Sequence, residues 1–284
     1  YSPAVDRRDD RRIAGAPVKP TPRIHTSLWC LGLLTALASG CGGQIGVGSD
    51  VLWTALFEGD SFGEWTGITG GNAQAFPAPP NTVAVSSDRA HRGTFAANLT
   101  ITAGPDGAQE NAVLSRAGDL PEEAYYSAWF YLTRTVTVGT FWVIIKFRTR
   151  DNADDPSTTN ELYDLDLINM PSGEMTLQLY DHRTATNIAL DVADPVVPVG
   201  NWFQIEAYYR NAADTTGRAT FWLNGQQIVD VTGQPTGPTP WVEWDACSVA
   251  EDLTPSTTTL YIDDCAISLT RVGPSGIIAS SSAD

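Results

Sequence analysis

Two cations, a tyrosine and a histidine are the residues best suited to proton transfer and charge neutralisation. Lys146 and Arg148 stand two residues apart in an apolar run, and Tyr180 and His182 stand two apart at the end of another. Because side chains alternate across a strand, the members of each pair would share one strand face. A cation could neutralise a sugar carboxylate while Tyr180 or His182 removes a proton. This set suits β-elimination from an acidic polysaccharide.

Two carboxylates suggest a second kind of chemistry. Residues Asp164 to Asn169 read Asp-Leu-Asp-Leu-Ile-Asn, which has the spacing of the Glu-x-Asp-x-x-Glu motif in laminarinase-type glucanases. Retaining glycosidases need one carboxylate as nucleophile and one carboxylic acid as proton donor. Asn169 occupies the acid position, and an amide does not donate a proton as an acid does. Asp164 and Asp166 could instead pair with Lys146 and Arg148 across neighbouring strands.

A third interpretation is ligand binding without catalysis. Trp142, Trp202, Tyr208 and Trp222 would offer rings for sugar stacking on the polar faces of their strands. Amides and carboxylates would bind hydroxyls, and a basic strip that includes Arg150 would suit a uronate or a sulfated glycan. If a second protein layer covered this face, the cations would be neutralised internally. The predicted ligand-binding residues are Trp142, Lys146, Arg148, Asp164, Asp166, Gln178, Tyr180, Gln204 and Trp222.

Alternating apolar and polar residues predict that strands carry all these groups. Phe141, Val143, Ile145 and Phe147 would form one buried face, opposite Trp142 and the cations. Asn224-Gly225 between two apolar runs predicts a type I′ hairpin, and Pro171-Ser172-Gly173 predicts a further turn. The expected strands are 51–58, 82–86, 94–102, 112–115, 124–134, 139–149, 161–169, 173–181, 186–190, 201–210, 218–223, 226–231, 240–246 and 257–269. They predict an all-β, two-sheet antiparallel sandwich.

Composition excludes several classes of function. The 284-residue chain has a net charge of −16, and residues 1–41 hold six of its basic and three of its acidic residues. That leaves 11 basic and 30 acidic residues from residue 42 onward, a balance of −19. Such a domain repels nucleic acid and anionic lipid. Beyond residue 41 only His91 and His182 are present, and neither suggests a Ser-His-Asp triad; no Cys/His cluster or phosphate-binding glycine loop is visible.

The N-terminal region has the pattern of an export signal. Residues 18–41 combine basic residues, a short apolar run and the small residues before Cys41. Their end resembles the bacterial lipoprotein box, which implies lipidation of Cys41 and an outer-membrane or cell-surface location; an ordinary secretory signal is the alternative. We expect residues 1–17 to be a non-native extension and 42–50 a flexible tether. The sandwich would cover residues 51–271, and residues 272–284 would be a disordered tail.

The remaining cysteines suit an exported protein. Cys30 lies in the signal and Cys41 at its end, which leaves Cys247 and Cys265. An even pair in an oxidising compartment predicts a disulfide between them. The alternative is two buried free thiols.

Three segments together resemble concanavalin-A-like jelly-rolls. They are Leu56–Asp60 followed by Trp65, His91–Leu99, and Leu260–Asp264. This group includes carbohydrate-binding modules, laminin-G-like domains and the alginate and glucuronan lyases. The resemblance covers residues 51–269. In the carbohydrate-binding modules the first and last strands share a structural calcium, which implies Glu58 with Asp263 or Asp264 as Ca²⁺ ligands; surface acids are the alternative.

The chain departs from the lyases of this group at two motifs. Their Gln-x-His strand corresponds to Lys146-Phe147-Arg148, and their late Tyr-Phe-Lys-x-Gly-x-Tyr strand corresponds to Trp241–Cys247, which has no tyrosine. The sequence therefore favours non-catalytic binding of an extracellular polysaccharide, including acidic ones. The alternatives are a polysaccharide lyase with an atypical site and a structural or adhesive surface protein.

Overall fold

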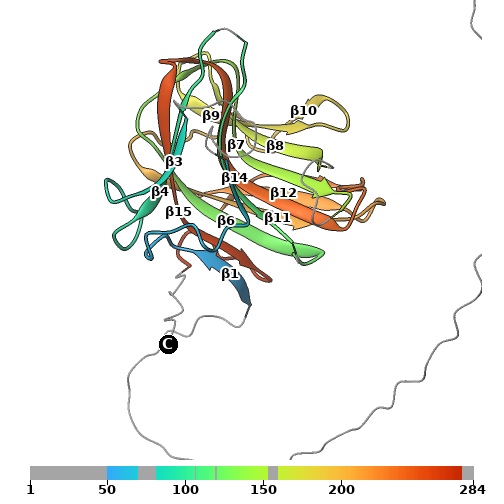
Figure 1. Ribbon diagram of the computed structural model, residues 1–284. Helices are drawn as coiled ribbons and strands as arrows, with labels where there is room; N and C mark the ends of the chain where they lie inside the picture. Colours follow the sequence, from blue (N-terminus) through green and yellow to red (C-terminus); the bar gives the residue numbers. More distant parts are fainter. Residues whose placement is uncertain (1–49, 70–80, 106, 119, 153–158, 277–284) are drawn as a thin grey trace, which may run out of the picture. The chain divides into compact units, whose positions relative to one another are not determined.

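The computed structural model describes residues 50–69, 81–105, 107–118, 120–152 and 159–276 (Figure 1). The signal, Cys41, most of the tether and most of the acidic loop after Arg150 lie outside these ranges. The described residues form fifteen strands and no helix. Accordingly, no helix in this part of the chain is long and apolar enough to cross a membrane. The all-β prediction is confirmed.

Sheet A contains eight antiparallel strands. Its order is β13-β12-β11-β6-β15-β4-β3, and β1 also pairs with β15. The first and last strands therefore lie together, as the jelly-roll resemblance implied. The strands are β1 (Val51–Ala55), β3 (Thr82–Ser86), β4 (Ala96–Thr102), β6 (Glu123–Leu132), β11 (Trp202–Arg210), β12 (Arg218–Leu223), β13 (Gln226–Thr232) and β15 (Thr257–Ser268).

Sheet B contains seven antiparallel strands in the order β10-β9-β8-β7-β14-β5-β2. The strands are β2 (Gly67–Thr69), β5 (Glu110–Ala117), β7 (Thr137–Arg150), β8 (Thr159–Asn169), β9 (Met175–Asp181), β10 (Thr186–Ile188) and β14 (Trp241–Thr254). Two features were not expected from the sequence: the short β2, and the extension of β14 to Thr254. In Figure 1 the two sheets form the layers of the sandwich.

The core between the sheets is rich in aromatic rings. Phe147 of sheet B stacks on Tyr209 of sheet A with ring centroids 4.4 Å apart. Tyr126 meets the edges of Phe147 at 5.1 Å and packs against Trp244 at 5.5 Å. Edge-on and offset ring pairs of this kind stabilise a core beyond the area they bury. The strand alternation predicted for β9 and β11 is confirmed, because Met175, Leu177, Leu179, Phe203, Ile205, Ala207 and Tyr209 all belong to this core.

A β-bulge makes part of the β7 prediction wrong. The register with β8 shifts between Val143 and Ile145, and an extra residue at a bulge exchanges the two faces of a strand. Trp142 and Ile144 therefore enter the core together with Ile145. Phe141 and Val143 lie on the opposite face of the sheet, beside Val113 and Val249. Trp142 is completely buried and donates from Nε1 to Ser248 Oγ (3.0 Å), so it offers no ring to a ligand.

The two predicted turns are confirmed. Asn224 and Gly225 have φ values of 49° and 82°, as a type I′ turn requires, and they join β12 to β13. Gly173, with φ of 89°, donates its N–H to the Met170 carbonyl (2.8 Å) between β8 and β9. These turns fix the register of the strands on either side.

The C-terminal segment covers part of the outer face of sheet A. Glu206, which is fully buried, accepts from Arg271 Nε (2.8 Å) and from the Val272 N–H (2.6 Å). Gln204 donates from Nε2 to the Gly273 carbonyl (3.0 Å). Val272 and Gly273, at the start of the segment that we predicted to be a disordered tail, thus contact the sheet.

The predicted disulfide is not formed. Cys247 and Cys265 are both buried free thiols. Cys247 lies on β14 of sheet B and packs with Val143 on the outer side of that sheet. Cys265 lies on β15 of sheet A and belongs to the core between the sheets. Since the two side chains occupy different apolar clusters, the even count reflects packing and not a cross-link.

Candidate functional site

A cleft of about 430 Å³ opens on the face of sheet B that points away from the core. Strands β7, β8 and β9 supply most of its walls, because successive outward-facing residues of adjacent strands meet side by side. The residues that line it are Gln109, Thr140, Phe141, Val143, Lys146, Glu161, Asp164, Asp166, Ile168, Gln178, Tyr180, His182 and Asn187. Five of these residues are acidic or basic: Lys146, Glu161, Asp164, Asp166 and His182.

Asp164 joins the two cationic side chains of the cleft. Its Oδ2 lies 3.1 Å from Lys146 Nζ and 2.9 Å from His182 Nε2. Glu161 Oε1 lies 3.3 Å from the same Lys146 nitrogen. Burial opposes the charge of Lys146, but the carboxylates of Asp164 and Glu161 outweigh it and raise the lysine pKa. Contact with Asp164 likewise raises the pKa of His182, against the effect of burial.

Asp166 is the second carboxyl group of β8 that faces the cleft. It is 8% exposed, and its Oδ1 has no hydrogen-bond partner among the described residues. Burial and the neighbouring charge of Asp164 raise its pKa to about 7, although Lys146 and His182 act in the opposite direction. Near neutral pH this side chain can therefore donate a proton to a hydrogen bond or, once ionised, accept one.

A further bulge in β8 brings Glu161 to the same cleft. The register between β7 and β8 shifts at Phe147/Arg148, so Leu162 and Tyr163 both enter the core. Glu161 and Asp164 then share the open face despite a spacing of three residues. Our sequence reasoning missed Glu161 for this reason; it also missed Gln109 and Asn187, which come from loop and edge segments without alternation.

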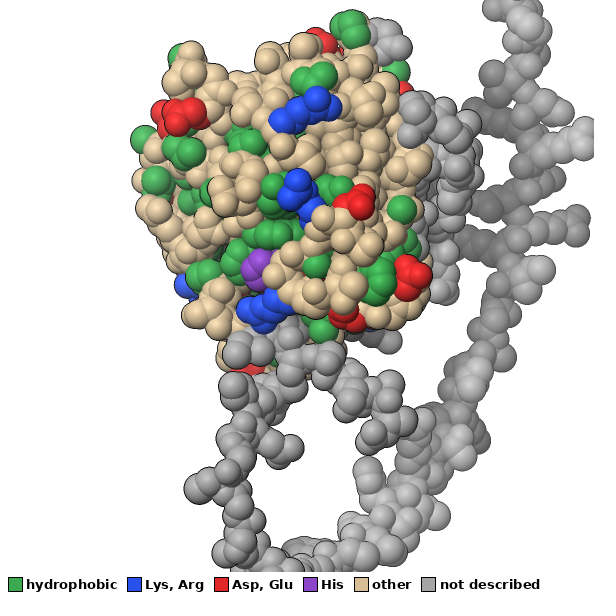
Figure 2. Space-filling view, turned by 90° about the vertical axis from the view of Figure 1, so that its left-hand side faces the viewer, with side chains coloured by type: hydrophobic (Ala, Val, Ile, Leu, Met, Phe, Trp, Pro, Cys, Tyr) green, Lys and Arg blue, Asp and Glu red, His purple; other side chains and the backbone are tan. Residues whose placement is uncertain are grey.

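Arg148 and Arg150 do not line the cleft, although both are on β7. Arg148 pairs with Glu243 (2.7 Å) and with Asp245, and Arg150 pairs with Glu243. Glu243 and Asp245 are buried on β14. The predicted basic strip is thus neutralised by acids of the neighbouring strand in the same sheet, and not by a second protein layer. On the face shown in Figure 2, Lys and Arg side chains lie as separate groups and form no continuous basic patch.

Apart from Arg148, the predicted ligand-binding residues divide among three places. Lys146, Asp164, Asp166, Gln178 and Tyr180 line the cleft, and so does His182. Trp142 is in the core. Gln204 and Trp222 belong to sheet A, where Gln204 is fully buried and Trp222 is 9% exposed under Arg271, whose guanidinium carbon lies 4.3 Å from the ring centre. Sequence alternation cannot tell which of two sheets a polar face belongs to.

The acids predicted to bind calcium hold a loop in place. Glu58 Oε1 accepts from the N–H groups of Thr94 (2.9 Å) and Phe95 (3.1 Å). Asp263 Oδ2 accepts from the His91 N–H (2.8 Å), and Asp264 Oδ2 lies 2.5 Å from His91 Nδ1. No group of three or more His, Cys, Asp or Glu in the described ranges is arranged to hold a metal ion. The calcium site stays a prediction, and the same oxygens would have to exchange backbone donors for the ion.

Comparison with known proteins identifies the architecture. No known family matches this sequence, and no curated protein matches it. A search of solved structures finds an endo-β-1,4-glucuronan lyase from the fungus Trichoderma reesei with a TM-score of 0.60 at 15% identity, which covers 80% of this chain and 100% of that one. The chain has the two-sheet jelly-roll fold.

Two further structures share this fold. The cellulose-induced protein Cip1 matches with a TM-score of 0.51 at 17% identity, and the match covers 78% of this chain and 98% of Cip1. The alginate lyase Aly36B has a TM-score of 0.51 at 11% identity, covering 77% and 97%. At these identities the likeness establishes the fold, and the chemistry has to be argued from the cleft.

Proposed function

We propose that this protein is a polysaccharide lyase that cleaves an acidic polysaccharide by β-elimination in the sheet B cleft. The observation that carries the proposal is the convergence of Lys146, Tyr180 and His182 with two buried carboxyl groups in one cleft. Titratable groups with perturbed environments gather in this way at catalytic sites. Two structures of the same fold are described as acting on glucuronan and on alginate, which supports an acidic substrate.

The same geometry weakens the binding-only interpretation that the sequence favoured. That interpretation relied on a row of tryptophan rings, but Trp142 is in the core and Trp222 belongs to the other sheet. Tyr180 and Phe141 are the aromatic residues that line the cleft. A site with few stacking rings and several ionisable groups is better suited to moving protons than to holding a neutral sugar chain.

Tyr180 is placed to move the proton. Its ring meets the edge of His182 with centroids 4.9 Å apart. In its phenolate form it would take the proton from C5 of the uronate, and the C5 electron pair would form the C4=C5 double bond. The C4–O4 bond would break, and O4 would take the same proton back from Tyr180. The tyrosine ends unchanged, and the products are an unsaturated uronate and a free 4-hydroxyl end.

His182 and Asp166 would bind the substrate carboxylate and reduce its negative charge. Because contact with Asp164 raises its pKa, His182 holds its proton more readily and can present a positive charge to the uronate. Protonated Asp166 can donate a hydrogen bond to the same carboxylate. Both interactions withdraw charge from the carboxylate and so acidify C5–H, which is the requirement of β-elimination. Lys146 is enclosed by Asp164 and Glu161 and would act mainly by fixing their positions.

The site of action follows from the substrate. An acidic polysaccharide is met outside the cell, which agrees with the export signal expected at residues 18–41 and with an anchor at Cys41. Structural calcium at Glu58, Asp263 and Asp264 would serve the fold, because these acids hold the His91–Phe95 loop and do not line the cleft.

The test is to incubate the full chain with a panel of polyuronates and to follow the ultraviolet absorbance of the unsaturated product. We expect Tyr180→Phe to reduce the rate by about 10²-fold or more, the usual loss for a proton-transfer group. Tyr208→Phe is the matched control, since Tyr208 lies on sheet A and donates to Glu123 (2.7 Å). Glycan retardation in native gels without any absorbance change would instead establish a binding module, and neither signal would leave a structural role.

A further inference from the structure

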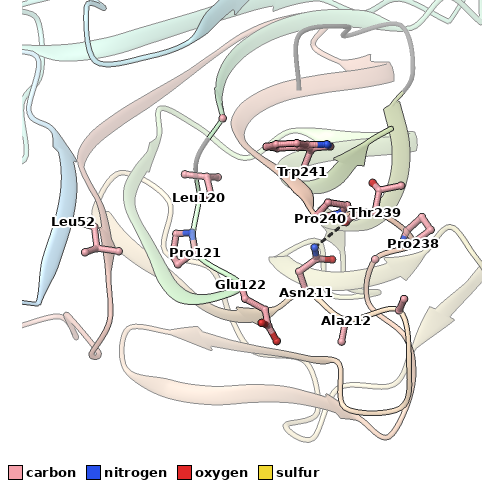
Figure 3. Close-up of a pocket in the computed structure, with 13 residues that line it drawn as sticks. Leu52, Leu120, Pro121, Glu122, Asn211, Ala212, Pro238, Thr239, Pro240 and Trp241 are labelled. Atoms are coloured by element: carbon pink, nitrogen blue, oxygen red, sulfur yellow. Dashed lines mark hydrogen bonds between the residues drawn. The ribbon is translucent and has the colours of Figure 1, made fainter. Parts of the chain in front are cut away.

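A second hollow lies at the rim of the sandwich (Figure 3). It measures about 810 Å³ and is formed where β6 begins, where β11 ends and where the chain enters β14. Its walls combine polar and apolar surface, and the apolar part includes Leu120, Pro121, Pro238, Pro240 and Trp241. None of the catalytic groups proposed above belongs to it.

Asn211 presents an unused acceptor in this hollow. The residue is 8% exposed, and its Nδ2 donates to the Thr239 carbonyl (2.8 Å; dashed line in Figure 3). Its Oδ1 is buried and has no hydrogen-bond partner in the part of the chain that the structure describes. A Cβ at Gly237 would come within 1.8 Å of this oxygen, so a larger residue there would displace the Asn211 amide. A buried acceptor without a partner costs free energy, which a ligand hydroxyl would recover.

Trp241 supplies the second element of a sugar site. It is partly exposed and lies near Asn211 in Figure 3, with Pro240 between the two side chains. An indole face beside a hydroxyl acceptor is the usual combination for a pyranose ring, which stacks one face and hydrogen-bonds at its edge. Glu122 is the one ionisable side chain among the residues that line the hollow. The site therefore suits the hydroxyl-bearing faces of sugars better than their carboxylates.

A third hollow, of about 490 Å³, shares lining residues with both the rim hollow and the catalytic cleft. It shares Glu161 with the cleft. It shares Ala213, Gly237 and Pro238 with the rim hollow. The three depressions thus follow one another around the end of sheet B. A single extended polymer could lie in all of them, whereas a short oligosaccharide would fill only one.

We propose that the rim hollow is a remote binding site for a further stretch of the same polysaccharide chain that the cleft holds. The inference rests on the proposed function for the identity of the occupant. The rim hollow would make the protein selective for long polysaccharide chains, because only long chains reach Trp241 and Asn211 while occupying the cleft. It also implies internal cleavage of a polymer, since the chain must extend past the reacting sugar.

The test compares affinity and cleavage for a polyuronate and for its short oligosaccharides. Trp241→Ala removes the stacking ring and should weaken binding of the polymer by roughly three- to tenfold, with little effect on short oligosaccharides. Ala213→Trp is an exposed substitution at the shared wall and should act in the same way by blocking the path. Thr215→Trp is its matched control, exposed in the same loop but outside all three hollows.

The outcomes separate this inference from the proposed function. Equal losses for long and short chains, or no loss in either Trp241→Ala or Ala213→Trp, would overturn the remote site even if cleavage is normal. If both variants abolish length-dependent binding and no unsaturated product forms with the unaltered chain, the remote site is supported and the proposed lyase activity is wrong. Because Ala213 is on the surface, its variant gives an answer even where Trp241→Ala does not fold.

Discussion

Asp166 is a cleft residue whose charge changes near neutral pH. Its pKa of about 7 means that it is mostly neutral below that pH and ionised above it. Lys146, Asp164 and His182 are the charged groups that act on it. When Asp166 and His182 are protonated, the two cations balance Asp164 and Glu161; loss of both protons leaves a net charge of −2. We therefore expect affinity for a polyuronate to fall as pH rises through about 7, measured by titration at constant ionic strength.

Asp166→Asn is the variant that checks this expectation. An amide keeps the hydrogen-bond donor and cannot ionise, so the loss of affinity above pH 7 should shrink, leaving the part due to His182. The pH dependence of protein stability should change in the variant as well. Because folding raises the pKa of Asp166, this carboxyl group lowers the free energy of unfolding of the native protein as pH rises from about 4 to about 7. An unchanged pH profile of both affinity and stability would show that Asp166 is not the titrating group.

Buried ion pairs join strands β7 and β14 beside the cleft. Glu243 and Asp245 are 2% and 0% exposed, and Arg148 is the partner that both share. Arg148→Ala would leave two buried carboxylates without that partner, which typically costs about 3–5 kcal/mol. We expect a fall of this size in the free energy of unfolding, measured with denaturant. Loss of activity in this variant would then report on folding and not on charge neutralisation.

Arg218→Ala provides the comparison for that experiment. Arg218 pairs with Asp230 at 2.8 Å on β12 and β13, but its side chain is 45% exposed. An exposed pair of this kind contributes about 0–1 kcal/mol. Similar losses in the two variants would contradict the claim that burial makes the β7–β14 pairs important.

Much of each strand could be predicted from alternation, and the exceptions have physical causes. Leu177, Ile205 and Phe221 face the core as their alternation indicated, because β9 and β11 are regular and the shift in β12 comes after Phe221. Trp142 does not, since one bulge in β7 exchanges the faces on either side of it. A bulge leaves no mark in the apolar pattern, since Val143, Ile144 and Ile145 are equally apolar.

Partner elements were a second source of error. Gln204 sits on a correctly predicted strand, but the segment near Gly273 covers it, so it is unable to meet a ligand from that side. Lys146 and Arg148 share one face, yet the first meets β8 acids at the cleft and the second meets β14 acids beside it. Strand order decides which neighbour each cation receives, and order depends on contacts distant in the sequence.

For the whole molecule, net charge opposes the substrate that the cleft is proposed to take. The chain carries a net charge of −16, and a polyuronate is a polyanion. At low ionic strength the long-range field repels the polymer, while contacts within the cleft act over a few ångströms and are screened less. We expect association to become faster and tighter as salt is raised from about 10 mM to about 150 mM, where the Debye length falls from about 30 Å to about 8 Å.

The reverse trend would point to a different balance of forces. A steady weakening with salt is the behaviour of proteins that bind polyanions through exposed cations. That result would mean that His182 and other basic groups dominate the encounter despite the surrounding acids. A neutral glucan is the control, since its binding should not depend on salt in this range. Measured with the polyuronate and the glucan side by side, the salt response thus separates a locally neutral cleft in an acidic protein from a basic binding surface.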